Sequence, residues 1–206
     1  MIDWALIPVK RFDVGKSRLR KVFTLQELVL LNISLFQSTF LKVKDSRQFA
    51  HILVVSRDDD ALAWTKANHG ESLHEEGEET LNSALAQGLE WIASQGAGSV
   101  LILPTDIPLL TVDDLFSLCA YQPEDPGMLI VPDHMQLGTN ALLLTRPNLL
   151  KPQFGANSFQ AHCQQAERAH IHQTIYLNKH IQQDIDTPDD LALIQQSYLF
   201  KSPIAS

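Results

Sequence analysis

The chain has 206 residues, a formal net charge of −8 and 45% hydrophobic residues, so we treat 1–206 as one domain with enough apolar residues for a core. The acidic balance argues against broad nucleic-acid binding, which needs an extended basic face. No apolar run reaches 18 residues, no basic leader precedes a short apolar run, and there are only two cysteines. We therefore expect no membrane span, no signal peptide and no disulfide framework, and hence a cytoplasmic protein.

Short apolar runs alternate with amphipathic stretches along the chain, and no linker divides it. Thr24 with Glu27, and Thr111 with Asp114, have the spacing of residues that cap helix starts. In chain order, strands are expected at 4–9, 51–56, 71–74, 99–104, 127–131, 140–145 and 171–177. Helices are expected at 24–43, from the acidic turn after residue 56 to residue 68, at 80–94, after Thr111, at 158–169 and from Thr187.

This alternation predicts an α/β fold, with a sheet covered by helices on both faces. The strands near 130 and 142 are too close for a helical crossover, so the sheet is expected to be mixed and mostly parallel. In open α/β sheets, ligands bind outside the carboxyl ends of the strands. The segments to inspect are therefore those at strand ends: 10–21, 105–106, 138–139 and 184–186.

The segment 10–21 holds six of the sixteen basic residues and a single acid, Asp13. Its tripeptide GKS at 15–17 invites a P-loop interpretation. That motif needs a glycine five positions before its GK glycine, where this chain has Lys10. The spacing therefore excludes a P-loop, and the concentration of positive charge needs another explanation.

Three aspartates are candidates for metal binding. Asp106 follows the apolar strand 99–104 and is either a turn residue or a metal-binding carboxylate at the floor of a cleft. Asp184 and Asp186 are separated by one residue, so an extended segment places both carboxylates on one side. Thr187 already supplies the helix cap, which argues against capping as the role of Asp186. Carboxylates without a cysteine or histidine cluster favour a hard cation, Mg²⁺ before zinc.

An anion site is indicated where FGANSF, residues 154–159, opens a helix, because free N–H groups and the helix dipole attract phosphate or carboxylate. The alternatives are that Ser158 only caps the helix and that 138–140 only forms a tight turn. The sequence has no nucleophile motif. An attacking group that is already an ionised phosphate oxygen needs no general base, so positive charge and positioning would suffice.

Six segments stand out when the motifs are taken in chain order: IPVKRFDVGKSRL, LNSALAQG, LPTDIPLL, GTNALLL, FGANSFQAH and DIDTPDDL. They resemble, in the same order, the guanylyltransferase family of coenzyme F420 biosynthesis, whose members are described as 2-phospho-L-lactate or phosphoenolpyruvate guanylyltransferases. The resemblance extends from residue 7 to about 193. It implies a GT-A-like nucleotidyltransferase fold, GTP as donor, a small phospho-acid as acceptor and Mg²⁺ as cofactor.

The resemblance also implies roles for individual residues. Candidate GTP-binding residues are Lys10, Lys16, Ser17, Arg18 and Asn82. Candidate metal ligands are Asp106, Asp184 and Asp186, with Asp106 and Lys16 also as catalytic residues. Candidate acceptor-binding residues are Thr139, Gly155 and Ser158. The chain departs from the family pattern at Arg11, where proline is usual, at Thr80, where glycine is usual, and at 135–137, where a second glycine-threonine unit is common.

The implied reaction is attack by an acceptor phosphate oxygen on the α-phosphorus of GTP, with pyrophosphate leaving. The alternatives are a molybdopterin or sugar-phosphate nucleotidyltransferase, which would have a fuller GxGxR start to the first loop, a non-catalytic nucleotide-binding regulator, and a family member that uses 3-phosphoglycerate. Leu137, Phe154 and Phe159 are expected to form apolar walls that gain little from an acceptor hydroxyl. We therefore expect phosphoenolpyruvate or 2-phospho-L-lactate as acceptor, with a lean toward planar phosphoenolpyruvate.

Overall fold

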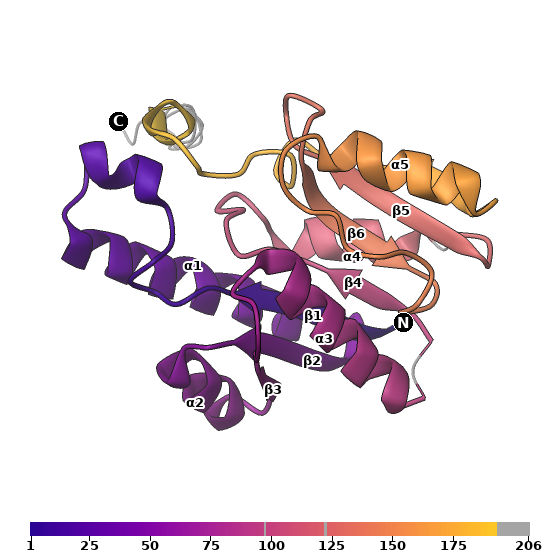
Figure 1. Ribbon diagram of the computed structural model, residues 1–206, viewed down its shortest axis with the longest axis horizontal. Coiled ribbons are helices and arrows are strands. Elements are labelled where there is room, and N and C mark those ends of the chain that lie inside the picture. The colour runs from indigo at the N-terminus through magenta and orange to yellow at the C-terminus, as the bar shows by residue number, and fades with distance from the viewer. Residues whose placement is uncertain (97, 122, 193–206) are drawn as a thin grey trace, which may run out of the picture.

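The computed structural model describes residues 1–96, 98–121 and 123–192, which contain one seven-stranded sheet in the order β3-β2-β1-β4-β6-β5-β7 (Figure 1). All the strands expected from the sequence are present, with ends that differ by a few residues. Their bounds are β1 (Ile2–Val9), β2 (Phe49–Ser56), β3 (Glu71–His74), β4 (Val100–Ile102), β5 (Gly127–Pro132), β6 (Thr139–Leu144) and β7 (His172–Ile175). The expected α/β fold with a mixed, mostly parallel sheet is confirmed.

Three helices begin where the sequence places their caps, whereas α5 has Asn157, not Ser158, at its cap position. Thr24 and Glu27, and Thr111 and Asp114, form complete capping boxes. The last helix begins after Thr187, whose side chain donates to Asp190, and is described as far as residue 192. No described helix is long and apolar enough to cross a membrane. The helices are α1 (Leu25–Ser46), α2 (Asp59–Ala67), α3 (Leu81–Ser94), α4 (Val112–Ala120) and α5 (Ser158–Arg168), and a short 3₁₀ helix, Ser17–Lys21, was not expected.

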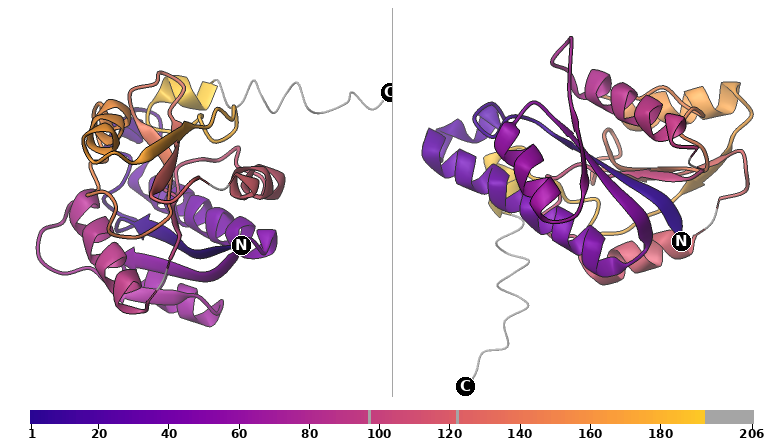
Figure 2. Two further views of the ribbon diagram at one scale, coloured as in Figure 1. Left: turned by 90° about the vertical axis from the view of Figure 1, so that its right-hand side faces the viewer. Right: turned by 90° about the horizontal axis from the view of Figure 1, so that it is seen from below.

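Helices cover both faces of the sheet, as Figure 2 shows. On one face, α1, α2 and α4 pack against a core that includes Ala5 and Ile7 of β1. On the other face, α3 and α5 pack against a core that includes Trp4 and Leu6. Successive residues of a strand point to opposite faces, so the apolar run 4–9 of β1 is buried on both sides.

One edge of the sheet collects the loops that carry the candidate residues. β6 runs antiparallel to its neighbours β4 and β5, whereas the pairs β1–β2, β1–β4, β2–β3 and β5–β7 are parallel. The amino end of β6 therefore lies beside the carboxyl ends of β4 and β5, and Thr139 pairs with Pro132 at this edge. Chain reversal at β6 thus brings residues 139–140 to the ligand-binding edge.

Gly88 allows α3 to pack closely on β1 and β2. A Cβ at this position would lie 2.7 Å from Leu6 Cδ1 and 2.9 Å from Val55 Cγ2. We predict that Gly88→Ala lowers the melting temperature, because overpacking costs about 1–3 kcal/mol and outweighs the ~1 kcal/mol of helix propensity that alanine gains. Thermal unfolding followed by circular dichroism measures the change. The exposed Ala86→Gly variant in the same helix calibrates the propensity term, and a Gly88→Ala protein more stable than wild type would contradict the packing.

Candidate active site

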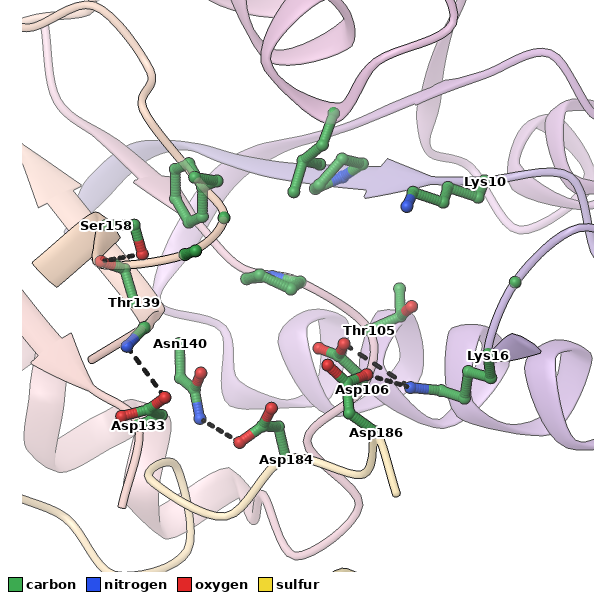
Figure 3. Close-up of a pocket in the computed structure, with 18 of the residues that line it drawn as sticks. Lys10, Lys16, Thr105, Asp106, Asp133, Thr139, Asn140, Ser158, Asp184 and Asp186 are labelled. Carbon is green, nitrogen blue, oxygen red and sulfur yellow. Dashed lines mark hydrogen bonds and ion pairs between the residues drawn. The ribbon is translucent and has the colours of Figure 1, made fainter. Parts of the chain in front are cut away.

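A cavity of about 530 Å³ opens at the carboxyl edge of the sheet. Most of its lining comes from five segments that are distant in sequence: the loop after β1, the residues after β4, the turn between β5 and β6, the loop before α5 and the segment before the last helix. Asn32 of α1 and Leu81 of α3 complete the lining. Figure 3 shows a charged end with Lys16, Asp106 and Asp186, and a hydroxyl end with Thr139 and Ser158. The cavity therefore offers two chemically different ends to one or two ligands.

Lys16 connects the basic loop to two aspartates. Its side chain is only 9% exposed, and its Nζ lies 3.6 Å from Asp106 Oδ2 and 3.6 Å from Asp186 Oδ1. The same ammonium donates to the carbonyl of Ile185, whose N–H donates to the carbonyl of Asp106 at 2.9 Å. These contacts hold the segment 184–186 against the end of β4 and place one cation between two carboxylates.

The carboxylates at this end are crowded and partly buried. Burial and then the charge of Asp106 raise the pKa of Asp184 to about 6, although Asn140 Nδ2 donates to it at 3.3 Å. Burial and Asp106 also raise the pKa of Asp186, while Lys16 and Arg18 act in the opposite direction. Like charges near one another in a poorly solvated place disfavour ionisation. The arrangement is therefore stabilised by added positive charge.

The aspartates fit Mg²⁺ better than a metal held by protein alone. Within the described parts of the chain, no three histidine, cysteine, aspartate or glutamate side chains form a group that could hold a metal ion. The carboxylates of Asp106 and Asp186 nevertheless lie close together, because the same ammonium, that of Lys16, is 3.6 Å from each of them. Mg²⁺ is usually bound by one or two carboxylates together with substrate phosphates and waters. Two carboxylates beside a basic loop suit a metal ion that binds together with a nucleotide.

At the other end, a hydrogen-bonded chain orients the Thr139 hydroxyl. The backbone N–H of Gln153 donates to His162 Nε2 at 3.1 Å, so this nitrogen carries no proton. Burial lowers the pKa of His162 to about 4, so the ring is neutral at pH 7 and its proton lies on Nδ1, 3.1 Å from Thr139 Oγ1. Ser158 Oγ also donates to Thr139 Oγ1 at 3.1 Å. Thr139 then accepts two hydrogen bonds and keeps its own proton for a ligand.

The loop before α5 has an unusual backbone. Gly155 has φ 124°, where a side chain would be strained, and Asn157, just before the helix, has φ 58°. Asn82 fixes this loop: its Nδ2 donates to the carbonyl of Phe154 at 3.0 Å, and the N–H of Phe154 donates to its Oδ1 at 2.7 Å. The assignment of Asn82 to GTP stays a prediction, since the contacts of this amide are to the main chain of the loop.

The cavity brings together most of the residues selected from the sequence. The side chain of Ser17 lies outside the described part of the structure, and Asn82 is not in the cavity lining. Phe159, expected as an apolar wall, instead packs against the core beneath α5. The residues that line the cavity as expected are Lys10, Lys16, Arg18, Asp106, Leu137, Thr139, Phe154, Gly155, Ser158, Asp184 and Asp186.

Sequence reasoning missed the polar lining residues Asn32 and Asp133, and it gave no role of their own to Thr105 and Asn140. Asp133 follows β5, so a consistent search after every strand would have found it. Its carboxylate accepts from the N–H groups of Leu137 and Gly138, each at 2.8 Å, and so shapes the turn before Thr139. The walls near Thr139 are therefore less apolar than the sequence suggested.

The chain matches the family model described as guanylyl transferase CofC like over residues 3–196. It belongs to this family. A phosphoenolpyruvate guanylyltransferase from Rubrobacter xylanophilus is 33% identical over 197 residues, which cover 96% of this chain and 95% of the relative. A 2-phospho-L-lactate guanylyltransferase from Methanothermobacter thermautotrophicus is 31% identical over 192 residues, 92% of this chain and 82% of the relative. The resemblance found in the sequence is thus confirmed.

Solved structures share the fold. A protein from Desulfovibrio desulfuricans G20, named as a nucleotide-diphospho-sugar transferase, has a TM-score of 0.73 at 17% identity and covers 97% of this chain and 89% of its own. A nucleotidyl transferase from Methanothermobacter has a TM-score of 0.69 at 11% identity, with coverage of 98% and 99%. These similarities confirm the expected GT-A-like nucleotidyltransferase fold.

The crowded carboxylates lead to a prediction about stability. The pKa of Asp184 is raised in the folded state, so the stability that this group contributes is present below its unfolded pKa of 3.8 and is lost as the pH rises through about 6. At pH 7.5 without metal, Asp184→Asn should remove a penalty of about 1 kcal/mol after allowance for solvent screening. That change would raise the melting temperature by roughly 2–4 °C.

Thermal unfolding of wild type and Asp184→Asn in EDTA, at several pH values, measures this effect. We expect the difference to be largest at pH 7.5, to shrink at pH 5 and to vanish below about pH 4. Asp45→Asn, at an exposed position, is the matched control. A difference that grows as the pH falls would contradict the assignment.

Proposed function

We propose that the protein transfers GMP from GTP to a three-carbon phospho-acid, phosphoenolpyruvate or 2-phospho-L-lactate, with release of pyrophosphate, as a step of coenzyme F420 biosynthesis. Membership of the guanylyl transferase family and the names of its relatives support this proposal. The structural observation that carries it is the cavity with Lys16 and two aspartates at one end and the Thr139 hydroxyl at the other.

The charged end suits a triphosphate. Lys10, Lys16 and Arg18 line the cavity there, and the ammonium of Lys16 lies beside the carboxylates of Asp106 and Asp186. A triphosphate that binds in this loop would exchange the carboxylates for phosphate oxygens as partners of Lys16. The carboxylates would then be available to Mg²⁺, which supplies positive charge that offsets the negative charge of the phosphates.

The hydroxyl end suits the acceptor. Thr139 offers a proton, Gly155 leaves space beside the loop, and the amino end of α5 favours a negatively charged group. The acceptor phosphate is already ionised at pH 7, so one of its oxygens can attack the α-phosphorus without a general base. The new bond joins this oxygen to the α-phosphorus, the bond from the α-phosphorus to the bridging oxygen breaks, and pyrophosphate leaves with that oxygen.

Mass spectrometry of reaction products tests the proposal. The pure protein is incubated with each of the four nucleoside triphosphates and each of phosphoenolpyruvate, 2-phospho-L-lactate and 3-phosphoglycerate. We expect guanylylated phosphoenolpyruvate or phospholactate as the main product. When the three acids compete at equal concentration, a product that is mainly guanylylated 3-phosphoglycerate would refute the proposed acceptor. A product from a sugar phosphate, or no product with any nucleotide, would refute the proposed reaction.

Asp106→Asn should reduce kcat by roughly 10²–10³-fold, because the loss of one charge contact in the transition state has an effect of this size. The neutral amide has the same shape, so the fold should be retained. Steady-state kinetics with saturating GTP measures the change, and Asp45→Asn serves as the exposed control. Near wild-type turnover at limiting Mg²⁺ would show that Asp106 is only a turn residue.

His162 gives a prediction specific to the acceptor. In His162→Asn, the amide Nδ2 can replace Nδ1 as donor to Thr139, whereas His162→Gln replaces only the acceptor of the Gln153 N–H. We expect His162→Gln to raise the KM for phosphoenolpyruvate about five- to tenfold, the effect of one neutral hydrogen bond, with little change in the KM for GTP. His162→Asn should have a smaller effect. Equal changes in both KM values would indicate a purely structural role for His162.

A further inference from the structure

A second, smaller cavity of about 210 Å³ lies next to the first. The two cavities share residues 8–11 at the end of β1 and Leu81 at the start of α3. The smaller cavity extends from these shared residues toward the carboxyl ends of β2 and β3, which carry Arg57 and Glu75. A molecule with its charged part in the basic loop could therefore place a second part in this cavity.

The walls of the second cavity combine apolar and charged groups. Pro8, Val9, Val14, Leu81 and Ala84 contribute apolar surface. A flat, weakly polar ring system suits such walls, because its faces bury without losing hydrogen bonds. Hydrogen-bonding groups on its edge would have to meet the polar side chains of the same cavity.

Glu75 is an unusual member of this lining. Its side chain is only 7% exposed, and its Oε1 is buried with no hydrogen-bond partner among the described residues. Arg57 Nε lies 3.5 Å away as an ion-pair partner, but it too lacks a hydrogen bond, while its Nη2 donates to the carbonyl of Gly77 at 2.5 Å. Buried polar atoms are normally hydrogen-bonded, so a carboxylate oxygen that has an ion-pair partner but no hydrogen bond, on a residue that lines a cavity, leaves room for a donor from a ligand.

The chemistry of the nucleobases selects one ligand edge. An ionised carboxylate only accepts hydrogen bonds. Guanine presents two adjacent donors, N1–H and the N2 amino group, on its Watson–Crick edge. Adenine and cytosine each place an acceptor nitrogen beside one amino donor, and uracil places its single N–H between two carbonyls. Guanine is thus the base whose edge gives a carboxylate two donors with no opposed acceptor.

We infer that Glu75 recognises guanine, with its carboxylate accepting hydrogen bonds from N1–H and the N2 amino group of a nucleotide whose triphosphate lies in the basic loop. Arg57 holds this carboxylate in position through the ion pair and its bond to Gly77. The inference rests on the proposed function and adds the residue that distinguishes GTP from ATP. A purely structural Arg57–Glu75 pair would affect stability without changing the ratio of nucleotide affinities.

Equilibrium binding without acceptor tests the inference. Titration calorimetry gives Kd values for GTP, ITP and ATP with Mg²⁺. The proteins compared are wild type, Glu75→Gln and the control Glu76→Gln. The control makes the same charge change at an exposed neighbour outside the cavity. ITP lacks the N2 amino group. For wild type and Glu76→Gln we expect ITP to bind about tenfold more weakly than GTP, and ATP to bind more weakly still, from the usual strength of a hydrogen bond to a charged group.

For Glu75→Gln we expect GTP to bind at least tenfold more weakly than to wild type. The preference for GTP over ITP should fall at least tenfold, and the preference for GTP over ATP should fall toward one. Wild-type preferences retained in Glu75→Gln would overturn the inference. If this variant does not fold, 1-methyl-GTP decides the question with wild type alone. Binding within threefold of GTP would overturn the inference, and a loss of at least tenfold would support it.

The outcomes for recognition and for catalysis are separate. Guanine preference that depends on Glu75, without nucleotidyl transfer, would refute the proposed function and support this inference. Nucleotidyl transfer from GTP with nucleotide preferences that do not depend on Glu75 would support the proposed function and refute this inference.

Discussion

The ammonium group of Lys16 is the interaction on which the candidate site depends, because it lies between the carboxylates of Asp106 and Asp186 and donates to the carbonyl of Ile185. It joins the loop after β1 to a segment 169 residues later. Without a cation here, crowded carboxylates would repel one another in a partly buried place. When a triphosphate and its metal ion bind, the metal ion would offset the charge of the carboxylates and Lys16 would contact phosphate oxygens. Substrate binding and local stability are therefore linked through one lysine.

The direction of β6 is the second constraint. An all-parallel sheet would place the amino end of this strand at the opposite edge, far from the basic loop. Because β6 is antiparallel to β4 and β5, Thr139 and Asn140 lie beside the ends of the parallel strands. The chain of hydrogen bonds from Gln153 through His162 to Thr139 can then connect the loop before α5 to the sheet edge.

Three residues with an uncommon backbone conformation line the same cavity. Lys16 and Asn157 have positive φ values of 57° and 58°, and Gly155 has φ 124°. All three line the cavity. Left-handed backbone at residues other than glycine is kept only where the surrounding structure holds it, and such strain is common at functional sites. Here it accompanies two other costs, a buried glutamate without a hydrogen-bond partner at Oε1 and an aspartate with a raised pKa. Function and stability therefore oppose each other at this edge.

Features that depend on near neighbours along the chain follow from local sequence. The caps at Thr24 and Thr111 act over three residues, and the buried strands follow from short apolar runs, so both could be predicted without the fold. The ordered motifs also indicated the family and most of the cavity lining. Contacts between distant segments became visible only in three dimensions: Asn82 with Phe154, 72 residues apart, and Glu75 in a cavity with the loop after β1. No local pattern encodes these pairs, because they depend on which strand ends meet at one edge and on which polar atoms burial leaves without a partner.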